Sequence, residues 1–183
     1  METGSDINSK MNPQSQEAVA EHRTIKKVIG VTSSSGGAGR SFISGLLAIE
    51  LAKSGHQVGI LDANFTGSSI PLMFGLRGPI RIGDYSFLPL ESERGIKVIS
   101  PNLLVDDEKN TIIWKQALAA KVIEELFREV EWGNLDYLIL DLPLAASEIT
   151  ISILQVLPLD AVIFVNQPQI ISTRLSTKSI RIL

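Results

Sequence analysis

The sequence predicts an α/β fold, a three-layer, doubly wound and mainly parallel sheet, and three observations support this prediction. Strands of the buried type, with continuous apolar runs, alternate with helical patterns along the chain. A glycine-rich turn joins the first strand to the first helix, and two later strands end in Asp62 and Asp141. Because right-handed crossovers bring the carboxyl ends of parallel strands to one edge, we expect the turn and both aspartates to converge there.

The first predicted strand covers residues 26–32 and leads into the glycine-rich turn. The helix expected next, over residues 41–54, is apolar nearly all round and should therefore be buried widely. Gly55 is placed to end this helix. The later predicted elements are a strand at 57–62, a short apolar turn at 70–74, a connection over 75–95, a strand at 96–100, a helix over 114–130, a strand at 137–141, a helix over 148–156, a strand at 161–165 and a helix that begins at 170.

Length and composition indicate one globular domain. The chain has 183 residues, of which 44% are hydrophobic and 20% charged, a balance typical of soluble domains. Residues 1–24 are polar, so we predict a disordered tail followed by a nucleotide-binding domain over residues 25–183. The net charge of −3 and the lack of a basic run argue against nucleic acid as a partner. No apolar run is long enough for a membrane span, and we expect a cytoplasmic protein.

The glycine-rich turn has the composition of a phosphate cradle. Glycines at three of its positions let the backbone turn tightly and direct its N–H groups at one point, which the positive end of the next helix also faces. We predict that the turn binds a nucleotide, that Ser41 is a ligand of the accompanying Mg²⁺, and that Asp62 and Asp141 hold water molecules on that ion. The predicted nucleotide-binding residues are Ser35, Gly36, Gly37, Ala38, Gly39, Arg40, Ser41 and Phe42.

Two other interpretations of these residues stay open. A dinucleotide-binding turn would use Gly37 and Gly39 as its first two glycines and Asp62 as its ribose-binding carboxylate, but its third glycine position is Phe42. The aspartates at the strand ends could also only cap the turns that follow them.

From residue 26 onward the chain resembles the Mrp/ApbC-type P-loop ATPases, the iron–sulfur carrier branch of the MinD-like group. Residues 35–42 match the signature Lys-Gly-Gly-Val-Gly-Lys-Ser-Thr, and residues 61–71 match Leu-Asp-Ala-Asp-x-x-Gly-Pro-Ser-Ile-Pro. Further segments fall in the family's order, at residues 95–100, 132–138, 141–143, 158–160 and 168–169. The resemblance implies a P-loop NTPase fold, ATP binding linked to iron–sulfur assembly, and either a homodimer or an assembly partner.

The departures from the family pattern fall on its catalytic positions. Ser35 replaces the lysine that reaches a partner's nucleotide, Arg40 replaces the phosphate-loop lysine, and Asn64 replaces the aspartate that orients the attacking water. Ala145 and Ser147 stand where the family has glycines. The resemblance therefore implies degenerate catalytic positions at Arg40 and Asn64, and weak or absent ATP hydrolysis.

Two alternative functions accompany this prediction. One is a non-enzymatic adaptor built on a degenerate ATPase domain, and the other is a domain related to the bacterial tyrosine kinases, which share the phosphate loop and the stretch around Asp62. The resemblance also implies that the C-terminal part of the family fold, with its paired cysteines, is missing. Because the chain has no cysteine, we expect no iron–sulfur cluster on this chain alone.

Overall fold

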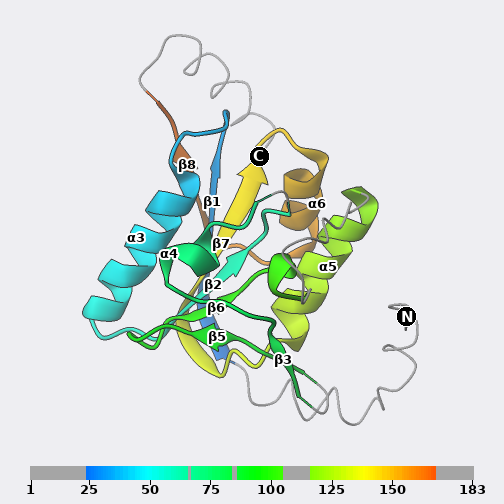
Figure 1. The fold of residues 1–183 in the computed structure, drawn as a ribbon. Coiled ribbons are helices and arrows are strands. Elements are labelled where there is room, and N and C mark those ends of the chain that lie inside the picture. Colours follow the sequence, from blue (N-terminus) through cyan, green and yellow to red (C-terminus); the bar gives the residue numbers. More distant parts are fainter. Residues whose placement is uncertain (1–23, 66, 84–85, 105–115, 168–183) are drawn as a thin grey trace.

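A computed structural model describes residues 24–65, 67–83, 86–104 and 116–167 of the chain (Figure 1). The strands and helices are, in order, β1 (Thr24–Ser33), α3 (Arg40–Lys53), β2 (Val58–Asp62), α4 (Ile70–Met73), β3 (Arg81–Ile82), β4 (Phe87–Leu88), β5 (Leu90–Glu91), β6 (Lys97–Ile99), the 3₁₀ helix η1 (Pro101–Leu104), α5 (Gln116–Glu129), β7 (Asn134–Leu144), α6 (Glu148–Val156) and β8 (Ala161–Val165).

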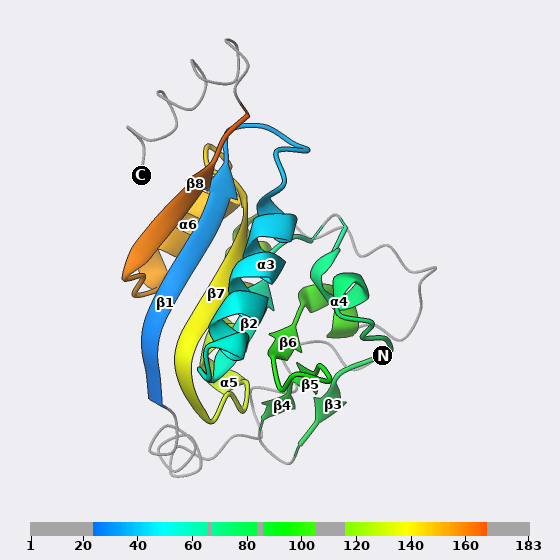
Figure 2. The same cartoon turned by 90° about the vertical axis from the view of Figure 1, so that its left-hand side faces the viewer.

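The main sheet is doubly wound, as predicted. Within the described residues, six strands pair in the order β5-β6-β2-β7-β1-β8. Every pair is parallel except β5 with β6, so the sheet is mainly parallel. In this order β7 lies between β2 and β1, and β1 lies beside the edge strand β8 (Figure 2). The predicted turn follows β1, and Asp141 lies near the carboxyl end of β7.

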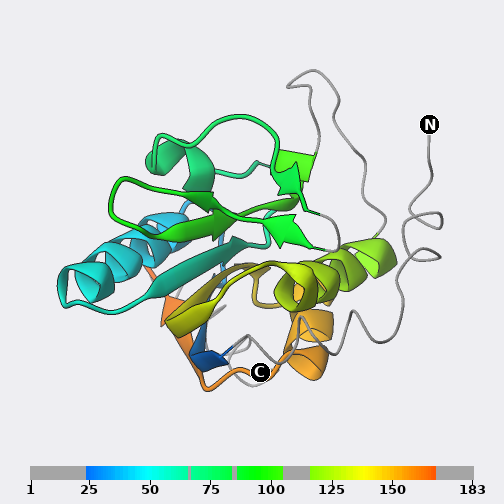
Figure 3. The same cartoon turned by 90° about the horizontal axis from the view of Figure 1, so that it is seen from below.

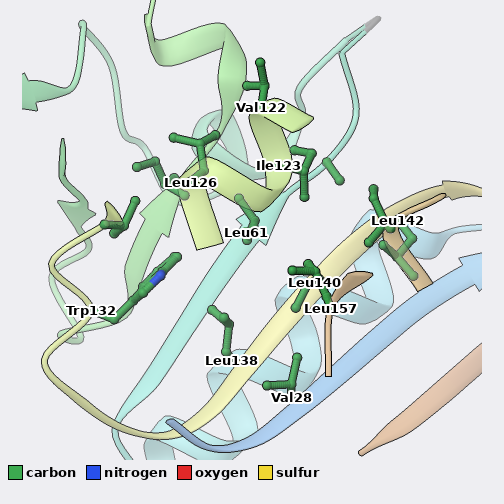
Figure 4. Close-up of a cluster of buried hydrophobic side chains, with 14 of the residues drawn as sticks. Val28, Leu61, Val122, Ile123, Leu126, Trp132, Leu138, Leu140, Leu142 and Leu157 are labelled. Atoms are coloured by element: carbon green, nitrogen blue, oxygen red, sulfur yellow. The ribbon is translucent and has the colours of Figure 1, made fainter. Parts of the chain in front are cut away.

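Helices cover both faces of this sheet and complete three layers (Figure 3). Apolar side chains of α5 and α6, among them Ile123 and Ile153, pack on one face together with Leu138 and Leu140 of β7. Helices α3 and α4 pack on the other face through Ala48 and Ile70. Figure 4 shows the first of these clusters, where the fully buried Trp132 lies at one end. Burial of these side chains supplies the main stabilising free energy of the fold.

The strands at the centre are uniformly apolar because they have helices on both faces. All five residues of β2 are buried, which is the pattern expected of a parallel strand inside an α/β fold. Helix α6 begins where the side chain of Ser147 accepts a hydrogen bond from the Thr150 amide at 3.2 Å, a typical N-cap. Helix α3 ends just before Gly55, whose φ of 86° is the left-handed conformation that ends many helices.

Most predicted elements are confirmed, with shifted boundaries. Thr24, assigned to the tail, already belongs to β1, and β7 extends beyond the predicted 137–141 at both ends. The connection predicted over 75–95 contains three two-residue strands, β3, β4 and β5. Such strands are too short for any periodicity to appear in the sequence. The tail, the start of the helix predicted from Trp114 and the helix predicted from residue 170 lie outside the described residues.

The expectation that α3 is buried widely is wrong. Phe42 is 61% exposed and Leu46 44% exposed. Its fully buried positions are the small residues Ser44, Gly45 and Ala48, while larger apolar side chains such as Ile43, Leu47 and Leu51 are only partly buried against the core. Small side chains let α3 pack closely against its neighbours, so part of its larger apolar surface remains outside the contact.

Candidate phosphate site

The loop between β1 and α3 has backbone conformations that require glycine at two positions. Gly37 has a φ of 70° and Gly39 a φ of 93°, both in the left-handed region that disfavours other residues. A Cβ atom built on Gly36, Gly37 or Gly39 would meet nothing within 4 Å. Glycine is therefore required at 37 and 39 by the backbone conformation, and no other atom of the described chain crowds the loop at these positions.

Asp141, at the end of the central strand β7, receives the hydroxyl groups of α3. Ser41 Oγ donates to its Oδ2 at 2.5 Å, and Ser44 Oγ donates to its Oδ1 at 3.0 Å. Burial raises the pKa of Asp141, while these two hydrogen bonds and the nearby charge of Arg40 act in the opposite direction. The first turn of α3 and the end of β7 are thus joined at the position where the sequence predicts a metal ion.

Asp62 lies on the strand beside Asp141, and the two residues are opposite each other in the pairing of β2 with β7. Its carboxylate is completely buried and accepts hydrogen bonds from Ser68 Oγ at 2.5 Å and from the Asn64 amide at 2.9 Å. Burial, followed by the charge of Asp141, raises the pKa of Asp62 to about 7, although the hydrogen bonds lower it. Two buried acids on adjacent strands favour a bound cation between the loops that follow them.

The oxygen atoms gathered here fit Mg²⁺ by type. Hydroxyl and carboxylate oxygens are the ligands that this hard cation prefers, and Ser41, Asp62 and Asp141 supply them. A cation would also reduce the cost of keeping two carboxylates buried side by side. Within the described residues, no group of three or more His, Cys, Asp or Glu side chains could form a metal site by itself. The fit therefore depends on the hydroxyl of Ser41 together with the two acids.

Arg40 and Asn64, the predicted degenerate catalytic residues, both donate to backbone carbonyl groups. Arg40 Nη1 donates to the carbonyl oxygen of Leu142 at 2.6 Å. Asn64 Nδ2 donates to the carbonyl oxygen of Gly67 at 3.1 Å within its own loop. An aspartate at position 64 could not make this bond, because an ionised carboxylate only accepts hydrogen bonds.

The remaining predicted residues of the loop are less engaged in the site. The carbonyl oxygen of Ser35 accepts a hydrogen bond from Ser33 Oγ at 2.8 Å, which fixes the start of the loop. Ala38 lies at the tip, between two residues in the left-handed conformation. The ring of Phe42 is mostly exposed, so it neither blocks the packing of α3 nor fills the cradle.

Three contacts of the candidate site were missed by reasoning from the sequence. Ser44 lies one helical turn after Ser41 and so shares its face, a spacing that could have identified it. Ser68 lies in the loop after β2 with no distinguishing pattern. Gln167 Nε2 donates to the carbonyl oxygen of Gly37 at 3.0 Å from the far end of the chain, a contact that only the fold brings about.

Among the described residues, no helix is both long enough and apolar enough to span a membrane.

Comparison with known proteins shows the family of the chain. Residues 24–183 match the ParA family through its NUBPL iron-transfer P-loop NTPases. An iron–sulfur cluster carrier protein of Clostridium perfringens is 42% identical over 153 residues, which are 79% of this chain and 54% of that protein. The chain spans about half the length of the curated relatives it matches.

Solved structures agree with the fold. A nucleotide-binding protein of Archaeoglobus fulgidus in complex with ADP superimposes with a TM-score of 0.75 and 34% identity, over 91% of this chain and 65% of that one. The MinC:MinD cell division complex of Aquifex aeolicus gives a TM-score of 0.60 at 23% identity, over 86% of this chain and 63% of the other. At that identity the second likeness shows the fold alone.

Proposed function

The chain belongs to the ParA family, among its NUBPL iron-transfer P-loop NTPases, and from this premise we propose that it binds ATP or ADP at the loop between β1 and α3 in the service of iron–sulfur transfer, with little or no hydrolysis. The observation that carries the proposal is the loop itself. Gly37 and Gly39 have the left-handed conformation, no other atom lies within 4 Å of a Cβ built on them, and Ser41 is hydrogen-bonded to Asp141. The ADP-bound relative from Archaeoglobus fulgidus supports nucleotide as the ligand. We propose the cytoplasm as the location, because ATP is available there.

Backbone N–H groups of the loop would carry the phosphate charge, as they do at other helix N-termini. Ser41, Asp62 and Asp141 would hold Mg²⁺, which neutralises phosphate charge when it is bound. The hydroxyl of Ser41 already points to Asp141, so it is positioned without a rotation of the helix. Ser44 holds the other oxygen of the same carboxylate and fixes its orientation.

The cargo would be an iron–sulfur cluster, and its protein ligands would have to come from outside these 183 residues. These 183 residues include no cysteine, and thiolates are the usual ligands of such clusters. We therefore propose an assembly partner, or a second polypeptide, as the source of the thiolates, and a nucleotide-dependent role for this domain in the transfer.

Hydrolysis should be weak because the side chains at the family's catalytic positions are changed. The guanidinium of Arg40 is bonded to a backbone carbonyl of β7 and does not have the compact shape of the ammonium it replaces. Asn64 cannot accept a proton from water as a carboxylate can. What remains is a site that binds phosphate better than it activates water.

Calorimetric titration tests the binding half of the proposal. We expect ADP and Mg²⁺-ATP to bind weakly, and Arg40→Lys to tighten binding by about 1–3 kcal/mol, the scale of a charge-assisted contact. Arg94→Lys, at an exposed turn far along the chain, is the matched control and should leave affinity unchanged. Absence of binding in both the wild-type protein and Arg40→Lys would remove the nucleotide from the proposal and favour the adaptor.

Turnover tests the other half. We expect phosphate release near background from the wild-type protein and from Asn64→Asp alone, because catalytic groups that act as a unit give strongly non-additive effects. The informative variant combines Ser35→Lys, Arg40→Lys and Asn64→Asp. Wild-type turnover on the order of one per second, common for enzymes, would show that Arg40 is a working substitute for lysine.

A further inference from the structure

The pairing of β1 with β7 is interrupted beside the candidate site. Val31 is opposite Asp141 and Ser33 is opposite Leu144, so Leu142 and Pro143 of β7 both face the single residue Thr32. This is a bulge, in which the extra residue is lost from the regular ladder of backbone hydrogen bonds.

Side chains, instead of the ladder, satisfy the two carbonyl groups at this bulge. Thr32 Oγ1 donates to the carbonyl oxygen of Pro143 at 2.7 Å, and Arg40 Nη1 donates to that of Leu142 at 2.6 Å. Leu142 is 1% exposed, so its carbonyl would lose a partner that water cannot easily replace if Arg40 moved away.

Arg40 is thereby shared between two parts of the site. Its backbone begins α3 directly after Gly39 of the phosphate loop, while its side chain reaches the end of β7. A guanidinium forms stronger, bidentate hydrogen bonds with phosphate than with a neutral carbonyl. A phosphate group in the loop would therefore compete with Leu142 for the same side chain.

We propose that Arg40 is a latch: it holds the bulge of β7 in place while the phosphate loop is empty, and a phosphate-bearing ligand draws its guanidinium away and loosens the segment from Leu142 to Ser147. This inference rests on the proposed binding of nucleotide, and it gives Arg40 a positioning role toward β7. The consequence reaches α6, because Ser147 at the end of this segment is the N-cap of that helix. Ligand binding at the loop would thus alter the N-terminus of α6, away from the phosphate itself.

The amide of Ala145 is a suitable reporter, since it lies inside the segment and donates to the carbonyl oxygen of Ser33 at 2.9 Å. We would measure its hydrogen exchange with and without saturating ADP and Mg²⁺, with binding confirmed by calorimetry on the same samples. In the wild-type protein we expect ADP to speed exchange by about tenfold, the scale expected for losing one charge-assisted hydrogen bond.

Two variants separate the latch from a merely structural contact. Arg40→Gln should exchange quickly without ADP and respond no further when ADP is added. Thr32→Val loses the neighbouring bond to Pro143 but carries no charge that phosphate could attract, so it should exchange quickly at rest and still respond to ADP. If Arg40→Gln does not fold, Arg40→Lys serves in its place, and its shorter reach to Leu142 should give faster exchange before ADP and a smaller rise after it.

The results can overturn the latch separately from the function. Bound ADP with unchanged or slower exchange at Ala145 in the wild-type protein would overturn the latch and leave nucleotide binding standing. A response of Arg40→Gln equal to that of the wild-type protein would do the same. A wild-type protein that binds no ADP would overturn the proposed function and the latch with it.

Discussion

At the residue scale, the buried carboxyl group of Asp62 makes folding stability depend on pH. Its pKa is about 7 in the folded protein and near 3.8 when the chain is unfolded. Between these values the folded protein keeps a proton that the unfolded chain has lost, so stability falls as pH rises from about 4 to about 7 and is flat above. Asp141, its neighbour on β7, also has a raised pKa and contributes with the same sign, while Arg40 moderates it.

Urea denaturation in metal-free buffer tests this dependence. The wild-type protein should be more stable at about pH 5 than at about pH 7.5, by an amount that scales as about 1.4 kcal/mol per unit of pKa difference. Asp62→Asn should show a shallower slope, with the remainder due to Asp141. Asp136→Asn is the control: Lys26 holds the pKa of Asp136 below its usual range, so that carboxyl is ionised throughout this interval. Equal or greater wild-type stability at the higher pH would contradict the assignment.

The sequence predicts the two acids of the candidate site but not the groups that contact them. Asp62 and Asp141 were identifiable because each follows a buried apolar run at or near the carboxyl end of a strand, and parallel strands end at one edge. The partners of their oxygens were not, because Ser68 and the amide of Asn64 reach Asp62 through the conformation of a loop. The direction of the Arg40 side chain also depends on a bulge between strands that are distant in sequence.

At the scale of elements, helix α3 shows that an apolar sequence does not by itself predict burial. The pattern of Phe42, Leu46 and their neighbours suggests a helix covered on most sides. In the structure the closest approach to α4 is at Gly45, where an added Cβ would lie 3.1 Å from the Met73 Cε atom, and the larger residues Ile43 and Leu47 are only partly buried. Which side of a uniformly apolar helix becomes its contact face is decided by shape, and hydrophobicity alone carries no such information.

Two substitutions of apolar residues should therefore differ in effect. Phe42→Thr, on the exposed part of α3, should change the free energy of unfolding by less than about 0.5 kcal/mol. Leu138→Ala, in the fully buried centre of β7, should cost about 2–5 kcal/mol, because it leaves a cavity in the packed core. Thermal or urea denaturation measures both. A large loss in Phe42→Thr would indicate that this ring is covered in solution, for instance by self-association.

At the scale of the whole molecule, the parallel sheet and its three layers were predictable from the alternation of strands and helices, whereas assembly was not. Ser35 has a short, uncharged side chain, so it cannot place a positive charge against phosphate groups bound by a second molecule. We therefore expect Mg²⁺-ATP to leave the mass of the protein unchanged in light scattering. Ser35→Ala should behave in the same way, since neither residue carries charge. A doubling of mass that depends on nucleotide would show that another residue supplies the missing cation.

The position of β1 between β7 and β8 has a consequence for how the chain folds. Both neighbours of β1 in the sheet, β7 and β8, are far from it along the sequence, and Lys26 meets Asp136 across 110 residues. Among the described strands β1 is made before its partners, so during synthesis it stays unpaired until β7 has emerged from the ribosome. Such non-local pairing also slows folding. The strand that precedes the glycine-rich loop is therefore exposed to aggregation until the sheet closes, and its apolar residues 28–31 are a segment that a chaperone could protect.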